Sequence, residues 1–267
     1  DYGWSHHHLE AFAIQEGCHG TRDGHGMSKD AYAVSAPVYD LLNASFRPGQ
    51  VAALERLIPL VRAESGPVLD IGAGSGLNTV FALERLPEAH VYALEPSTAM
   101  RALVLTKVAA HPEWFDRVTI RPEAFGATPL PDAISAAILL GVLGHFSPDE
   151  RAALFAALAA RLPEGGAALT DLQPPCRPAR VESYEIASAR IGDLTYSGLA
   201  EGWPLDDERM HWKMTCRTLD GDRVLAEETT EYLFRHPDPE VIQAELRATG
   251  LSLDQIDDTT FYLIVKD

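Results

Sequence analysis

Three glycines alternate with other residues directly after a short apolar run, in the segment VLDIGAGSGLNT at residues 68–79. Gly72, Gly74 and Gly76 can adopt positive φ angles and let a ligand approach the backbone without meeting a Cβ. The pattern after them predicts a helix, whose free amide groups and dipole favour a negatively charged ligand group. This loop is the first candidate binding site, and Asp70 lies two residues before its first glycine.

The glycine spacing bears on which nucleotide the loop could bind. A dinucleotide fingerprint reads G-x-G-x-x-G/A, whereas this chain has Leu77 at the third glycine position. Glu95, in the segment YALEPS, can accept hydrogen bonds from both ribose hydroxyls of an adenosine, each contributing about 1.5–3 kcal/mol. NAD enzymes also place an acid there, so an NAD-dependent oxidoreductase stays open as a second hypothesis, testable by fluorescence titration with NADH.

Strand-like and helix-like segments alternate along the first two thirds of the chain. Buried strands are expected around PVLDIGAG and at 90–96, 117–124, 133–140 and 167–172, with helices at 47–64, 76–86, 97–110 and 147–163. Such alternation predicts a parallel sheet covered by helices on both faces. Ligands of these sheets bind at the carboxyl ends of the strands, which is where the glycine loop and Glu95 are expected.

Four motifs in this order resemble those of the Rossmann-like, class I S-adenosylmethionine (SAM)-dependent methyltransferases that act on small molecules. They are VLDIGAGSG, LEPS, PDAISAAILLGVLGHF and LPEGGAALTDL, and the resemblance covers about residues 31–172 and the last helix and strands. It implies an α/β fold with a doubly wound, mostly parallel seven-stranded sheet, whose last strand is antiparallel, and an antiparallel β insertion acting as a lid. It also implies SAM as the cofactor and S-adenosylhomocysteine (SAH) as its product.

The resemblance assigns the cofactor contacts residue by residue. Asp70 and the three glycines would surround the methionine part of SAM, Glu95 would hold the ribose, and Met100 would lie against the adenine. The other cofactor-binding candidates are Ala73, Asn78, Pro96, Ser97, Glu123, Ala124, Phe125, Leu140 and Gly141. For Met100 and Glu123, core packing and a solvated loop position are equally good interpretations.

Two residues are candidates for the chemistry of transfer. His145 follows the fourth strand in GVLGHF, and an unshifted pKa near 6.5 would suit a base at neutral pH. Tyr39 lies on an N-terminal segment that folds over SAM in similar enzymes, where it could contact the cofactor's charge or the acceptor. For His145 the alternative is a loop-closing or capping role, and for Tyr39 it is a packed aromatic.

The acceptor side is expected in the segment after the core. Asn43 and four aromatic residues, Tyr184, Trp203, His211 and Trp212, are candidate substrate-binding residues. Aromatic rings can hold an amine by cation–π contact, although alternating aromatics in a hairpin are commonly cross-strand pairs. A small-molecule acceptor is predicted, with a slight preference for an amine nitrogen over an oxygen or carbon. A non-catalytic SAM-fold partner protein is the third hypothesis.

The expected organisation has five parts. Residues 1–26 are a disordered or artificially added extension, 27–66 an N-terminal helical cap, 67–172 the SAM-binding core, 173–236 the substrate-binding insertion with a β-hairpin around 210–235, and 237–267 the helix and strands that complete the core.

Composition limits the partners. The net charge of −17 disfavours nucleic acid, and the apolar run 133–144 is about half of the roughly 20 residues that a membrane helix needs. No metal site is expected, and His6, His7 and His8 are attributed to a solvated tail. A cytoplasmic location is expected because the cysteines lack a disulfide pattern, and a homodimer through the long strands is a candidate assembly.

Overall fold

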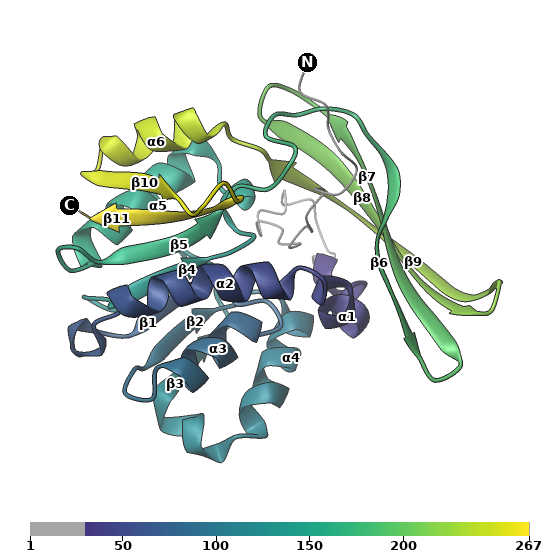
Figure 1. The fold of residues 1–267 in the computed structure, drawn as a ribbon, viewed down its shortest axis with the longest axis horizontal. Coiled ribbons are helices and arrows are strands. Elements are labelled where there is room, and N and C mark those ends of the chain that lie inside the picture. The colour runs from purple at the N-terminus through teal and green to yellow at the C-terminus, as the bar shows by residue number, and fades with distance from the viewer. Residues whose placement is uncertain (1–29, 267) are drawn as a thin grey trace, which may run out of the picture.

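The computed structural model describes residues 30–266, which form two separate β-sheets with helices around the larger one (Figure 1). The larger sheet has seven strands in the order β10-β11-β5-β4-β1-β2-β3. These strands are β1 (Val68–Ile71), β2 (Val91–Leu94), β3 (Val118–Arg121), β4 (Ala136–Leu139), β5 (Ala167–Asp171), β10 (Leu251–Gln255) and β11 (Phe261–Lys266). The extension predicted at residues 1–26 lies outside the described residues.

Strand directions match the predicted architecture. β11 runs antiparallel to both β5 and β10, and every other neighbouring pair in this sheet is parallel. The doubly wound, mostly parallel seven-stranded sheet with an antiparallel last strand is therefore confirmed. The carboxyl ends of β1, β2, β4 and β5 lie along one edge of the sheet, so the loops after them can form one site.

Helices cover both faces of the larger sheet (Figure 1). They are α1 (Tyr39–Asn43), α2 (Arg47–Leu57), α3 (Leu77–Arg85), α4 (Thr98–Ala109), α5 (Pro148–Arg161) and α6 (Pro239–Arg247). Leu54 of α2 and Phe81 of α3 belong to the apolar core on one face. Phe155 of α5 and Leu246 of α6 belong to the core on the other. The sheet is therefore the middle of three layers.

Helix ends follow local chemistry. α5 begins with a capping box, in which the Ser147 hydroxyl accepts from the amide of Glu150 while the Glu150 carboxylate accepts from the amide of Ser147. The helix predicted over 47–64 is wrong in its second half. α2 ends at Leu57 and is followed by two short 3₁₀ turns, because Pro59 lacks the amide hydrogen that would continue the helix.

The smaller sheet is antiparallel throughout, with the order β6-β7-β8-β9. Its strands are β6 (Val181–Ile191), β7 (Leu194–Pro204), β8 (Arg209–Asp220) and β9 (Arg223–Arg235). β8 and β9 form the expected hairpin, whereas the sequence left residues 180–209 unassigned. The far ends of the strands project beyond the rest of the molecule (Figure 1), and residues 223–229 of β9 are exposed.

The segment before α2 joins the two sheets. Leu42 of α1 shares an apolar cluster with Met100 of α4 and with Trp212 and Met214 of β8. One face of the smaller sheet is thus packed against the N-terminal residues, which in turn pack on the core. This arrangement places α1 directly above the loops that follow β1 and β2.

No helix within residues 30–266 is both long enough and apolar enough to cross a membrane. In the same residues, no group of three or more His, Cys, Asp or Glu side chains is arranged to hold a metal ion. His6, His7 and His8 lie outside this part of the chain.

Candidate functional site

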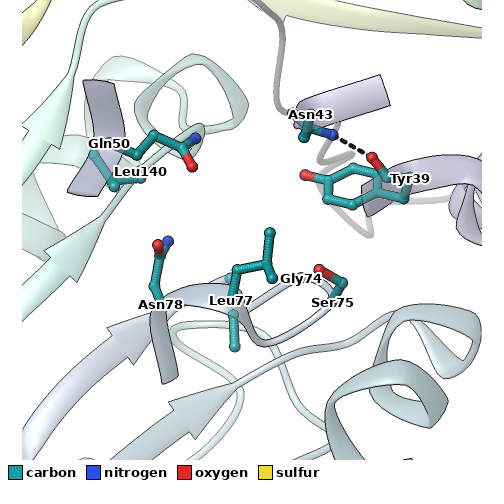
Figure 2. Close-up of a pocket in the computed structure, with 10 residues that line it drawn as sticks. Tyr39, Asn43, Gln50, Gly74, Ser75, Leu77, Asn78 and Leu140 are labelled. Atoms are coloured by element: carbon teal, nitrogen blue, oxygen red, sulfur yellow. Dashed lines mark hydrogen bonds between the residues drawn. The ribbon is translucent and has the colours of Figure 1, made fainter. Parts of the chain in front are cut away.

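A cleft lies where the loop after β1 faces the N-terminal helices (Figure 2). Its enclosed space is about 30 Å³, and it opens to solvent. The glycine loop, α1, α2 and the end of β4 all contribute to its lining, which consists of Tyr39, Asn43, Gln50, Gly72, Ala73, Gly74, Ser75, Leu77, Asn78 and Leu140. Gln50 was missed by the sequence analysis because it belongs to none of the motifs.

The glycines of the loop have different physical roles. At Gly74, where φ is +58°, an added Cβ would meet nothing closer than the Tyr39 hydroxyl at 3.8 Å, so the backbone faces open space in the cleft. At Gly76, where φ is +88°, an added Cβ would lie 2.4 Å from Cγ2 of Val104. Gly76 does not line the cleft. It lets α3 pack closely against α4, a role different from the predicted contact with a ligand.

Glu95 lies directly beside the glycine loop, at the end of β2. Its side chain is buried, and its carboxylate accepts hydrogen bonds of 2.7 Å from the amides of Gly74 and Ser97. The hydrogen bond from Gly74 therefore ties the predicted ribose acid to the predicted methionine loop.

Asp70 lies beneath the loop rather than in the cleft. Its buried carboxylate accepts a 2.6 Å hydrogen bond from the hydroxyl of Thr79 on α3. Burial raises the pKa of Asp70 to about 6, although the Thr79 hydrogen bond and the Arg47 charge act in the opposite direction. Arg47 itself donates to Asn78 Oδ1 at 2.6 Å, which fixes that side chain at the cleft wall.

Tyr39 and Asn43 close the cleft from the side of α1 (Figure 2). Asn43 Nδ2 donates to the backbone oxygen of Tyr39 at 2.8 Å. Burial, and the charges of Glu95, Asp40 and Asp171, raise the pKa of the Tyr39 hydroxyl, which therefore stays protonated at neutral pH. Asp40 anchors this helix, because it accepts a 2.5 Å hydrogen bond from Ser75 of the glycine loop.

The residues that the sequence predicts around an adenine have different surroundings in the structure. Met100 is buried in the cluster between the core and the smaller sheet and does not line the cleft. Glu123 is bound by the Arg121 guanidinium at 2.6 Å. Ser97 caps α4 by accepting from the Met100 amide, and Phe125 packs edge-on against Phe146. Pro96 and Ala124 are their neighbours in the loops after β2 and β3.

His145 is held in an apolar setting. Neither ring nitrogen has a hydrogen-bond partner among the described residues, and the ring lies edge-on to Phe234 at 4.9 Å between centroids. Burial, and secondarily the charge of Arg235, hold the pKa of His145 well below its ordinary value. The expectation of an unshifted pKa near 6.5 is therefore wrong, and the ring is neutral at physiological pH.

A second hollow lies beside the cleft, on the opposite side of the loop at 140–144. Its enclosed space is about 10 Å³, and it is lined by the loop after β4, the end of β5 and the end of β9, at Val142, Leu143, Gly144, Asp171, Leu172, Gln173, Phe234, Arg235, His236 and Pro237. Asp171 Oδ1 accepts a 2.6 Å hydrogen bond from the amide of Gly141. Burial raises the pKa of Asp171 to about 6, against hydrogen bonds from Gly141 and Gln173 that lower it.

Sequence reasoning missed Asp171 and His236. His236 is buried and accepts a 3.0 Å hydrogen bond from the indole nitrogen of Trp212, and its other ring nitrogen lies 3.1 Å from the backbone oxygen of Gln173. Burial lowers the pKa of His236 to about 4. The rule that ligands meet the carboxyl ends of parallel strands could have identified Asp171, since it ends β5.

The predicted aromatic pocket does not exist as one unit, because its members lie on opposite faces of the smaller sheet. Tyr184 and Trp212 belong to the cluster that faces the core. Trp203 and His211 are cross-strand partners on the other face. There the Arg180 guanidinium lies over Trp203 and His211 lies 3.2 Å from Glu231. Side chains alternate between faces along a strand, so adjacent residues 211 and 212 cannot line the same pocket.

The chemistry of the cleft fits SAM. The backbone at Gly74 faces open space where a Cβ would stand, the buried acid Glu95 holds that loop from the end of β2, and Leu140 supplies an apolar wall. Gly72–Gly74, Asn78, Glu95, Leu140 and Gly141 are the residues that would hold it. Met100 and Gly76 act in packing instead.

Comparison with known proteins finds similarity to methyltransferases. A family model described as "Methyltransferase domain" matches residues 68–166. A curated relative from Halorhodospira halophila, named malonyl-[acyl-carrier protein] O-methyltransferase, is 25% identical over 83% of this chain and 70% of its own.

Solved structures share the fold over nearly the whole of their own chains. Streptomyces venezuelae DesVI has a TM-score of 0.69 and 17% identity, covering 87% of this chain and 98% of its own. A SAM-bound amino pentose methyltransferase from Micromonospora echinaspora has a TM-score of 0.65 and 18% identity, with coverages of 85% and 97%. A sugar N-methyltransferase from a Streptoalloteichus species has a TM-score of 0.58 and 18% identity, with coverages of 96% and 99%.

Proposed function

From the premise that this chain is a SAM-dependent methyltransferase with its methyltransferase domain at residues 68–166, we propose that it methylates an amine nitrogen of a small molecule. The resemblance drawn from the four sequence motifs is confirmed by the family match. The family match therefore favours this interpretation over the two other hypotheses, an NAD-dependent oxidoreductase and a non-catalytic partner protein. What we propose is the class of acceptor, a small molecule, and the atom that is methylated, an amine nitrogen.

One observation carries the proposal of a SAM site in the cleft. The amide of Gly74 donates to the Glu95 carboxylate, so the loop that approaches the methionine part and the acid that accepts from the ribose are joined. When bound, SAM supplies a methyl group on a positively charged sulfur. The chain's own contribution is alignment and exclusion of water, which can supply about 7–11 kcal/mol for well-held reactants.

The state of His145 favours nitrogen as the acceptor atom. A hydroxyl acceptor must lose a proton as it is methylated and therefore needs an effective base. His145 is neutral but poorly basic, because burial and Arg235 lower its pKa. An amine carries its own lone pair once its ammonium form has lost a proton, so it makes no demand on His145. We assign His145 to positioning the acceptor, and the protonated Tyr39 hydroxyl to closing the cleft over the cofactor.

The comparisons support two candidate acceptor atoms. Two of the similar solved structures are named as methyltransferases of an amino pentose and of a sugar nitrogen, and their likeness extends over the smaller sheet because they cover at least 85% of this chain. The curated relative is named as an O-methyltransferase. Oxygen methylation is therefore the second candidate, and we propose that residues 173–236 choose between them.

An acceptor screen tests the proposal. The purified protein is incubated with SAM carrying a deuterated methyl group and with separate pools of small amines, phenols and carboxylic acids, and products are identified by mass spectrometry. We expect label in the amine pool, on nitrogen. Label only in the phenol or carboxylate pool would overturn the nitrogen assignment while retaining the enzyme class.

Assembly is a separate proposal. β6 and β9 are the edge strands of the smaller sheet, and β9 exposes Val224, Leu225 and Leu233. Exposed edges with apolar side chains can pair with a second copy. We propose a homodimer through this sheet, which sedimentation equilibrium would detect as twice the mass of one chain, and which a single-chain mass would contradict.

A further inference from the structure

The cleft and the second hollow share one wall, the loop that follows β4. Leu140 of this loop lines the cleft, while Val142, Leu143 and Gly144 line the hollow. Gly141 lies between them, and its amide donates a 2.6 Å hydrogen bond to Asp171. The charge of Asp171 also acts on the hydroxyl of Tyr39 across the cleft. Asp171 therefore stands at the boundary of the two spaces.

The hollow contains acceptor atoms that no part of the described chain satisfies. Gln173 is 8% exposed and donates through Nε2 to Asp171 at 3.3 Å, yet its Oε1 has no hydrogen-bond partner among residues 30–266. The ring nitrogens of His145, beside the hollow's Phe234, are also unpartnered there. Buried polar atoms are rarely left unpaired. Beside a carboxylate, a free amide oxygen indicates a ligand rich in hydrogen-bond donors.

We propose that this hollow receives the amine of the methyl acceptor, and that Asp171 is a catalytic residue that binds the amine as an ammonium ion and removes its proton. The proposal rests on the proposed function and adds a site and a residue to it. Gln173 would accept a second hydrogen bond from the same nitrogen or from a neighbouring hydroxyl of the acceptor. The enclosed space of about 10 Å³ has room for one water-sized group, such as the nitrogen of an amine, so the rest of the acceptor would lie outside the hollow.

The proposed step balances in protons and electrons. The ammonium ion gives one proton to the Asp171 carboxylate and becomes a neutral amine. Its nitrogen lone pair then forms the bond to the methyl carbon, while the carbon–sulfur bond breaks and its electron pair stays on sulfur. The product amine carries the positive charge, and the protonated Asp171 returns its proton to solvent. A carboxyl whose pKa is raised to about 6 can take up and release a proton near neutrality.

The groups that face Asp171 are compatible with this role. Tyr39 is a neutral hydroxyl across the cleft, and His236 is neutral because burial lowers its pKa to about 4. His145 is neutral for the same reason. Arg235 is the cation of the hollow, and its Nε lies 3.7 Å from a carboxylate oxygen of Glu208. Asp171 is the carboxylate among the residues lining the hollow, so it determines the preference for a cation.

Sinefungin provides a probe because it is an analogue of SAM with an amino group at the position of the transferred methyl. Its ammonium group would face Asp171, whereas SAH has no such group. Calorimetric titration of the full chain with sinefungin and with SAH gives a ratio of dissociation constants that isolates this contact. The variant is Asp171→Asn, which keeps an oxygen able to accept from Gly141. The matched control is Asp254→Asn, an exposed aspartate on the edge strand β10.

We expect Asp171→Asn to weaken sinefungin at least tenfold and SAH less than twofold, while Asp254→Asn changes neither. In the wild type, the preference for sinefungin over SAH should fall as the pH drops from 8 to 5, because Asp171 becomes protonated. If the Asp171→Asn variant does not fold, this pH dependence of the wild type tests the role of Asp171. An equal effect of Asp171→Asn on both ligands, or a pH-independent ratio, overturns the role of Asp171. Failure of the wild type to bind SAH would instead overturn the proposed function.

Discussion

The amide of Gly74 donates a 2.7 Å hydrogen bond to the buried carboxylate of Glu95. These residues follow different strands, β1 and β2, which pair in parallel so that their carboxyl ends meet. The bond fixes the glycine loop against the acid before any ligand arrives. Pre-organisation of this kind reduces the ordering cost of binding.

The contrast between Gly74 and Gly76 gives a first prediction. Alanine at Gly76 would place a Cβ 2.4 Å from Val104 at a φ of +88°, and we expect a loss of about 2–5 kcal/mol in the free energy of unfolding from overpacking plus left-handed strain. Alanine at Gly74 has room in the cleft and should cost only about 1–2 kcal/mol of stability, yet weaken SAH. Urea denaturation and calorimetry of both variants test this. Equal stability losses would contradict the assignment.

We predict that the free energy of unfolding depends on pH through Asp70. Its folded pKa is raised from 3.8 to about 6, so its contribution is fully present below pH 3.8 and is lost as the pH rises through 6. The total is about 3 kcal/mol, of which roughly 1–2 kcal/mol falls between pH 5 and pH 8. Asp70→Asn keeps an acceptor for Thr79 and removes this dependence.

Urea denaturation at pH 5 and pH 8 measures it. The stability of Asp70→Asn relative to the wild type should be higher at pH 8 than at pH 5 by that amount. A relative stability that does not vary with pH would mean that Asp70 is not perturbed.

Arg151 predicts a large stability effect. Its side chain is fully buried and binds Glu245 at 2.8 Å and Glu208 at 2.7 Å, which joins α5 to α6 and to the segment before β8. Arg151→Ala removes the cation that the partly buried carboxylates of Glu245 and Glu208 share, and we expect a loss of about 3–5 kcal/mol in the free energy of unfolding. Arg177→Ala is the control, because Arg177 is 81% exposed in its pair with Asp238 and should cost less than about 1 kcal/mol. Similar losses in both would contradict the prediction.

We predict that His145 does not take up a proton near neutral pH. Because burial and Arg235 hold its pKa well below the ordinary value, its ring nitrogens should keep the nitrogen-15 chemical shifts of a neutral imidazole at pH 6. Free histidine in the same buffer provides the reference chemical shifts. A His145 signal that titrates with a midpoint near 6.5 would contradict this prediction and make His145 a candidate for the catalytic base again.

Much of the core was predictable because local signals and tertiary structure agree there. The capping box at Ser147, the buried strands and the acid at Glu95 each follow from residue type and spacing. Gly76 was identified correctly as a residue that excludes a side chain, but the sequence could not say that the neighbour is Val104 on α4. That contact depends on how two helices pack.

The acceptor side was harder to predict for two physical reasons. β6 is exposed or half-buried along its whole length, so it lacks the apolar alternation that marks a strand. The sequence makes Trp203 and Trp212 equally good candidates for substrate binding. Only the strand register shows that their side chains lie on opposite faces of the smaller sheet. Asp171 lies within the motif LPEGGAALTDL, but its approach to Gly141 depends on how β4 and β5 pair and could not be seen in the sequence.

The measurement that tests the central claim most directly is calorimetric titration with SAH, for the wild type and for Glu95→Ala. Glu88→Ala, an exposed position before β2, serves as the control, and circular dichroism checks that each variant is folded. We predict micromolar binding by the wild type and by Glu88→Ala, weakened at least tenfold, or about 1.4 kcal/mol, in Glu95→Ala. A folded wild type that shows neither binding heat nor a thermal shift with SAH would contradict the account.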